Sequence, residues 1–201
     1  MKKSILLFGA LCLAGTSLFS QFKQKDVELA FSGTLGSWSA GRSSGGSSNS
    51  ESMKYFSLFL EPGYYLANSV SLEPEFGMMA VEQEQPAFYI IGNISYTYLP
   101  PDSKTALFVL AGYGISNAVQ YPLYNNVIMR ISKKMDVTVL NAAFGIKALV
   151  NDRVALRVGF NYKDHRRTPE NSGYYYYGVA PSQVEYTYSN VGLLVGLSVL
   201  L

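Results

Sequence analysis

The chain has 201 residues and a nearly balanced charge, with 16 lysines and arginines against 14 aspartates and glutamates. This balance argues against a general nucleic-acid-binding protein, which needs a basic footprint. The single cysteine leaves no partner for a disulfide within the chain, and the single histidine makes a metal centre unfavourable.

The beginning of the chain predicts a secretory signal peptide over residues 1–20. Two lysines follow the first methionine, residues 5–14 are largely apolar, and small residues come next. The apolar stretch is too short for a membrane-spanning helix. We expect cleavage after Ser17 or Ser20, which leaves residues 21–201 as one domain with no cysteine and no net charge.

After this segment, apolar residues alternate with small or polar ones in a period of two, which is typical of half-buried strands. Leu58 and Leu60, for example, share one face of a strand, while Ser57 and Glu61 share the other. Eight such stretches cover residues 27–36, 55–66, 70–81, 88–98, 106–117, 136–150, 153–162 and from about 190 to the end of the chain.

Two prolines within these stretches, Pro62 and Pro74, count against regular strand pairing at their positions. Proline has no N–H to give to a neighbouring strand. We therefore expect local irregularities there.

The connections alternate between long and short. Polar loops are expected at residues 41–50, 82–86, about 118–135 and about 163–183, and tight turns at 67–69, 100–104 and 151–152. Membrane barrels have short periplasmic turns and longer external loops. Eight strands would place both termini on the periplasmic side.

Residues 57–66 (SLFLEPGYYL), followed by 70–74 (VSLEP), resemble the second hairpin of the small outer-membrane barrels of the porin-family, OmpA/OmpX-like group. Residues 145–147 (GIK) and 155–157 (ALR) resemble a later hairpin of that group. The resemblance implies an all-β, eight-stranded, antiparallel, up-and-down transmembrane barrel in the outer membrane. Such barrels usually end in an aromatic residue that the assembly machinery reads, whereas this chain ends in Leu201.

Charged residues fall on the face of the strands expected to point into the barrel. These are Glu28, Glu61, Glu73, Glu75, Lys147 and Arg157. An eight-stranded barrel is only wide enough to be filled by side chains, and an unpaired buried charge is costly. Counting from the turns puts Glu73, Glu75, Lys147 and Arg157 at similar depth. We therefore expect a salt-bridged plug, with a gated ion path or a catalytic carboxylate pair as alternatives.

His165 is the only histidine and lies at the start of the expected fourth loop. Barrel enzymes that act on lipids or proteins hold a histidine beside a nucleophile and an acid. No serine stands in a recognisable motif with His165, so we expect a solvated loop residue. The sequence predicts no catalytic residues, no metal ligands and no cofactor.

The external loops are the expected place of recognition. Arg166 and Arg167 belong to a set of basic loop residues that would either pair with lipid phosphates or be solvated. Tyr174, Tyr175, Tyr176 and Tyr177 suit a recognition surface, or a strand that continues beyond the membrane.

The function expected from these features is that of a non-enzymatic outer-membrane barrel, acting in surface interaction, adhesion or envelope integrity through its loops. A narrow porin-like channel and a barrel enzyme acting on lipid are the alternatives. Gly36 and Trp38 are also compatible with a lipocalin, but a lipocalin buries its apolar face inside. The expected partners are outer-membrane lipid and an external ligand. We expect a monomer that does not bind nucleic acid.

Overall fold

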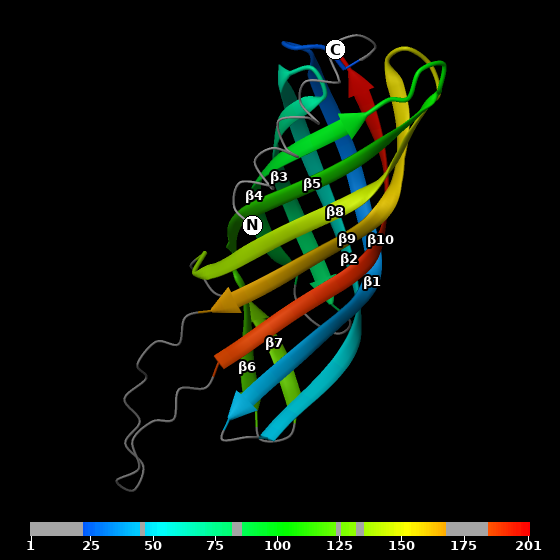
Figure 1. The fold of residues 1–201 in the computed structure, drawn as a ribbon. Helices are drawn as coiled ribbons and strands as arrows, with labels where there is room; N and C mark the ends of the chain where they lie inside the picture. The colour runs from blue at the N-terminus through cyan, green and yellow to red at the C-terminus, as the bar shows by residue number, and fades with distance from the viewer. Residues whose placement is uncertain (1–21, 45–46, 82–85, 124–125, 132–134, 168–184) are drawn as a thin grey trace, which may run out of the picture.

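The computed structural model describes residues 22–201 apart from 45–46, 82–85, 124–125, 132–134 and 168–184. Eight antiparallel strands close into a barrel in the order β1-β10-β9-β8-β5-β4-β3-β2 (Figure 1). They are β1 Val27–Ser44, β2 Ser47–Ala67, β3 Val70–Val81, β4 Ala87–Tyr98, β5 Thr105–Ser116, β8 Val137–Leu149, β9 Val154–Arg167 and β10 Glu185–Leu200. The eight-stranded antiparallel barrel expected from the sequence is therefore confirmed.

The barrel has two distinct ends. The terminal end holds Leu201, the start of β1 and the tight turns, and it lies at the top of Figure 1. The far end holds the extended ends of β1 and β2. The same end also holds β6 (Ala118–Leu123) and β7 (Asn126–Ile131), which form a separate two-stranded sheet. The expected signal peptide, residues 1–20, lies outside the described residues.

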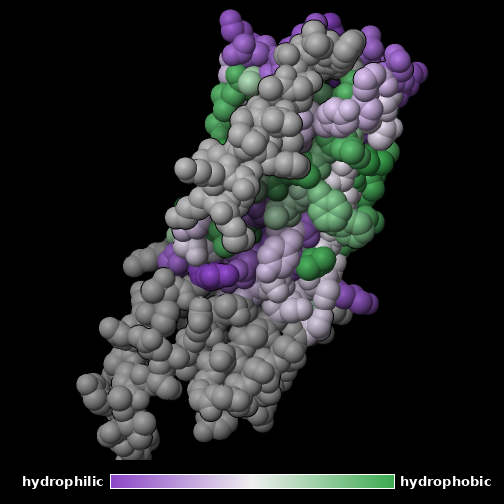
Figure 2. Space-filling model, viewed as in Figure 1, coloured by the Kyte–Doolittle hydropathy of each residue, from purple (hydrophilic) through white to green (hydrophobic). Residues whose placement is uncertain are grey.

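Alternation along each strand sorts side chains to the two faces of the wall. In β4, Tyr89, Ile91 and Asn93 are buried inside, whereas Phe88 and Ile90 are exposed outside. Hydrophobic side chains form a band on the visible outer wall, with hydrophilic ones toward both ends (Figure 2). An apolar outside around a polar inside is the arrangement of a barrel surrounded by lipid. In the described part of the chain, no helix is long and apolar enough to cross a membrane.

The two strand prolines coincide with a break in the pairing of β2 with β3. The pairing runs to Leu60 opposite Phe76 and resumes at Tyr64 opposite Leu72. Pro62 and Pro74 both lie in the interval, as expected for residues without an N–H. The same interval contains Glu61, Glu73 and Glu75, so the ladder is interrupted where three carboxylates enter the barrel.

The expectation of a flexible loop over residues 41–50 is wrong. β1 and β2 stay paired as far as Ser44 opposite Ser47. The sequence signal used for strands was an apolar face, and that signal stops where a strand leaves the lipid. Backbone pairing does not need an apolar face, so the hairpin continues with polar residues.

Two further expected loops are also partly strand. β9 continues to Arg167 rather than ending at residue 162, and it pairs with β10 as far as Tyr186. The expected third loop contains the β6–β7 hairpin. In β9, as in β1 and β2, the outward residues change from apolar to polar, but the backbone pairing with the neighbouring strand continues.

Inward glycines make room for large interior side chains. Gly145 lies opposite Gly159 on the neighbouring strand, and the Phe108 ring packs over this pair. A Cβ atom on Gly145 would lie 2.2 Å from the carbonyl oxygen of Val158 and 3.0 Å from the Phe108 ring. Glycine is therefore required where two backbones and an aromatic ring approach this closely.

We predict that Gly145→Ala destabilises the barrel by about 1–3 kcal/mol, the usual cost of overpacking. The matched control is Gly92→Ala on the outer wall, where the nearest atom to an added Cβ would be 3.9 Å away. Urea unfolding of both refolded variants measures the difference. Equal stability of the two variants would contradict the packing described for Gly145.

Candidate functional site

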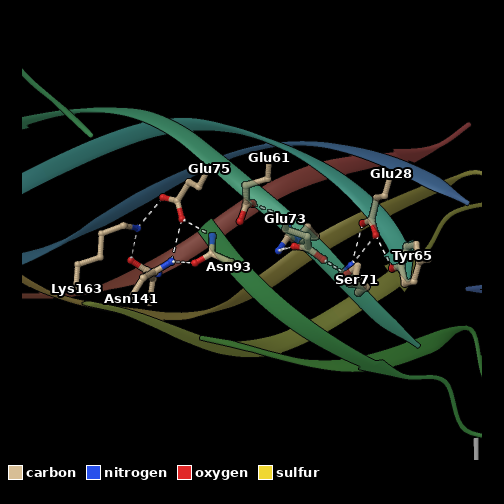
Figure 3. A network of polar contacts seen from close by, with 12 residues as sticks. Glu28, Glu61, Tyr65, Ser71, Glu73, Glu75, Asn93, Asn141 and Lys163 are labelled. Carbon is tan, nitrogen blue, oxygen red and sulfur yellow. Dashed lines mark hydrogen bonds and ion pairs between the residues drawn. The ribbon is translucent and has the colours of Figure 1, made fainter. Parts of the chain in front are cut away.

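A chain of polar contacts runs through the middle of the barrel, from the terminal end toward the far end (Figure 3). Its charged members are almost completely buried. We call it the interior network, and it consists of Glu28, Glu61, Glu73, Glu75, Lys147, Arg157 and Lys163, with Tyr65, Ser71, Asn93, Asn141 and Asn161.

The level nearest the terminal end is an ion pair between Lys147 of β8 and Glu28 of β1. The Nζ atom of Lys147 lies 2.8 Å from one carboxylate oxygen of Glu28 and 2.9 Å from the other. The Tyr65 hydroxyl donates a hydrogen bond of 2.7 Å to the same carboxylate. Both oxygens of Glu28 are thus satisfied, which a buried carboxylate requires.

The middle level has one guanidinium between two carboxylates. Arg157 Nη1 donates to Glu61 at 2.7 Å, and Nη2 lies 3.6 Å from Glu73. Ser71 donates a further hydrogen bond of 2.6 Å to Glu73. Among the described residues, Arg157 is therefore the one cation that forms ion pairs with both Glu61 and Glu73.

The level nearest the far end combines an ion pair with amides. Lys163 Nζ lies 2.9 Å from Glu75, and it also donates to Asn161 at 2.9 Å. Asn141 accepts from Asn161 at 2.8 Å and donates to Glu75 at 2.9 Å. Asn93 donates to Glu75 as well, at 3.2 Å. Four strands, β3, β4, β8 and β9, are joined in this way.

Aromatic rings cover all three interior cations. Lys163 Nζ lies 4.8 Å from the centre of the Phe59 ring and 5.1 Å from that of Tyr89. Arg157 lies 5.0 Å above Phe108, which is also 5.9 Å from Lys147. Ring faces attract cations and exclude water, so each charge has a favourable apolar neighbour in addition to its carboxylate.

The structure brings the six sequence-predicted interior residues into the barrel but not to the expected depths. Arg157 meets Glu73, as counting from the turns suggested, but Lys147 pairs with Glu28 and Glu75 pairs with Lys163. Strands in a barrel are tilted and staggered. Equal distance from a turn therefore does not mean equal depth.

His165 is buried in β9, so the expectation of a solvated loop histidine is wrong. Its ring lies 5.2 Å from that of Trp38, which stacks on Tyr188 at 5.9 Å. Within the described part of the chain, neither ring nitrogen has a hydrogen-bond partner. A catalytic histidine would need a nucleophile within reach, and the described surroundings of His165 are aromatic.

The expected recognition residues are described only in part. The exposed Arg166 side chain pairs with Asp164 of the same strand at 2.8 Å. The backbone of Arg167 ends β9, and Tyr174, Tyr175, Tyr176 and Tyr177 lie outside the described residues. Across the described positions, no three histidine, cysteine, aspartate or glutamate side chains converge to hold a metal ion.

Sequence reasoning missed Lys163 and Phe22. Lys163 continues the inward series of Arg157, Gly159 and Asn161, so the period of two could have found it. The sequence pattern predicts a loop at Lys163 because the outward apolar residues stop at Tyr162. Phe22 precedes the first alternating stretch, and no periodic signal marks it.

Comparisons with known proteins agree with this architecture. The sequence matches the family model described as outer membrane protein beta-barrel domain over residues 8–198. The crystal structure of Neisserial surface protein A superposes with a TM-score of 0.52 at 16% identity, covering 86% of this chain and 96% of that one.

The N-terminal β-barrel domain of Pseudomonas aeruginosa OprF gives a TM-score of 0.49 at 13% identity, covering 89% and 98%. No curated protein sequence matches the chain. At 16% identity, the likeness to Neisserial surface protein A shows the fold alone.

We predict that Arg157→Met lowers the free energy of unfolding by about 3–5 kcal/mol, because it leaves buried carboxylates without their cation. The matched control is Arg166→Met, which removes an ion pair of similar length from a side chain that is 57% exposed. Solvent around the Arg166 guanidinium weakens this pair, so we expect a smaller loss than at Arg157 even though the Asp164 side chain is only 10% exposed. Equal losses in urea unfolding would contradict the role given to the interior pair.

Proposed function

Because the chain belongs to the family of outer membrane protein β-barrel domains, we propose that it is a non-enzymatic barrel whose interior is closed by its own side chains. In this proposal the wall anchors the protein in the outer membrane, and the loops at the far end act in surface interaction, adhesion or envelope integrity. Membrane lipid is its constant partner, and the protein is a monomer.

The observation that carries the proposal is the filling of the barrel by the interior network. Lys147 and Arg157 are both 0% exposed, and each is held between carboxylates and rings. Large inward side chains, including Trp38, Tyr89 and Phe108, are buried in the same interior. An eight-stranded barrel leaves little interior room beyond its side chains. Ions passing through would have to displace paired charges.

The proposed orientation follows from the two ends of the barrel. The terminal end has the tight turns, and the far end has the extended hairpin of β1 and β2 and the hairpin of β6 and β7. Periplasmic turns of membrane barrels are short and external connections are longer. We therefore assign both termini to the periplasm, with residues 1–20 removed as a signal peptide during export.

The proposed contact surface is the far end. Arg166 is exposed there at the end of β9, and the sequence places four consecutive tyrosines, Tyr174 to Tyr177, in the connection that follows. Tyrosine rings give large contact areas at low entropic cost, and arginine pairs well with phosphate or carboxylate groups. These residues suit recognition of an external ligand better than chemistry on it.

We predict that the refolded mature protein gives no steady conductance steps in a planar bilayer. A gel shift between heated and unheated samples verifies folding, and a porin of known conductance verifies the membrane. Glu73→Gln and Arg157→Gln should stay silent and be less stable. Reproducible steps that change with either substitution would favour the narrow channel and contradict the closed interior.

A further inference from the structure

The five residues that precede β1, residues 22–26, fold across the terminal mouth of the barrel. Phe22 is 2% exposed, although it belongs to no strand. Its ring stacks on that of Tyr65, with 5.5 Å between ring centres. A large apolar side chain so completely buried at the edge of a barrel is a packed element of the fold rather than the end of a tether.

Backbone hydrogen bonds fix this segment in place. The Ser69 N–H donates to the carbonyl oxygen of Phe22 at 3.1 Å, and the Lys25 N–H donates to that of Tyr65 at 2.9 Å. The Gln24 N–H donates to the Asn68 side chain at 3.1 Å. Lys25 has a φ of 76°, a left-handed conformation that costs energy for a lysine. The surrounding contacts therefore hold the turn in a set shape.

Phe22 belongs to an apolar cluster whose members come from widely separated parts of the wall. Its apolar cluster contains Tyr65 of β2, Ala106 of β5, Leu149 of β8 and Leu200 of β10. These strands lie around the whole circumference and include β10, which pairs with β1 to close the barrel. The complete binding place for Phe22 therefore exists only after closure.

The Phe22 ring also covers the outermost ion pair. Lys147 Nζ lies 5.4 Å from the centre of this ring and 2.8 Å from Glu28. Excluding water from an ion pair lowers the local dielectric constant and strengthens the attraction. The ring thus separates the first level of the interior network from the solvent at the terminal end.

We propose that residues 22–26 form an N-terminal clasp that docks after the barrel has closed, seals its terminal mouth and slows its opening. The clasp joins β2 and β10, the two strands that flank β1, to β5 and β8 through one apolar cluster. Under the orientation proposed above, it separates the interior network from the periplasm. It does not depend on what the external loops bind.

Solvent access to the mouth tests the seal. Ala106 is 0% exposed and belongs to the Phe22 cluster, so Ala106→Cys places a thiol beneath the clasp. In the mature protein, which lacks residues 1–20 and with them Cys12, this is the only thiol. The probe is a charged methanethiosulfonate reagent, added to the folded protein in detergent micelles.

We expect Phe22→Ala to raise the labelling rate of this thiol at least about tenfold, which corresponds to only about 1.4 kcal/mol of lost contact energy. Phe31→Ala is the matched control, since it removes the same ring from the outer wall, where Phe31 is 57% exposed. It should leave the labelling rate unchanged. Asn68→Ala, which removes one backbone tie and keeps the ring, should give a smaller increase.

Unfolding and refolding rates test the late docking. A contact that forms only after closure is absent from the folding transition state, so losing it speeds unfolding and leaves refolding nearly unchanged. We expect this pattern for Phe22→Ala and not for Phe31→Ala. The gel shift verifies that each variant is folded at the start.

If the Ala106→Cys thiol is labelled at the same rate with and without the Phe22 ring, the proposed seal is wrong. A refolding rate that falls as much as the unfolding rate rises would overturn the late docking. A Phe22→Ala chain that does not fold at all would also overturn the late docking. In that case the seal is tested with Phe22→Leu, which keeps apolar volume and loses the ring, by measuring its labelling rate. Conductance of the parent barrel would contradict the closed interior without bearing on either measurement.

Discussion

The structure depends on one constraint, which is that backbone polar groups in hydrocarbon must find partners within the protein. The closed order of eight strands satisfies this constraint, because β1 pairs with β10 and leaves no free edge in the wall. Closure also decides the rest of the interior. Every second residue of each strand is forced into a narrow space, so the inward residues of distant strands become neighbours.

Within that space the charges do not form one cluster but three levels along the barrel. Each level joins a cation to at least one carboxylate from a different strand, with an aromatic ring beside it. Buried ion pairs contribute little net stability compared with apolar packing, but they penalise any register that separates them. We interpret the network as a device that favours one strand register over slipped alternatives.

The polar ends of the strands mark where sequence reasoning failed. The apolar pattern predicts loops at Lys163, His165 and residues 41–50, whereas the pairing of β9 with β10 and of β1 with β2 continues there. An apolar outward face indicates contact with lipid, not strand structure as such. Beyond the lipid that signal stops, while backbone pairing continues because it still satisfies N–H and C=O groups.

Because strand geometry has a period of two, the amino-acid pattern alone predicts the number of barrel strands, the inward face of six charged residues and the presence of both signs of charge inside. The ion pairs of Lys147 with Glu28 and of Lys163 with Glu75 can be seen only in the folded barrel. These partners depend on the stagger between strands, which no local pattern encodes. The position of Phe22 likewise depends on the closed barrel, since the other members of its apolar cluster come from β2, β5, β8 and β10.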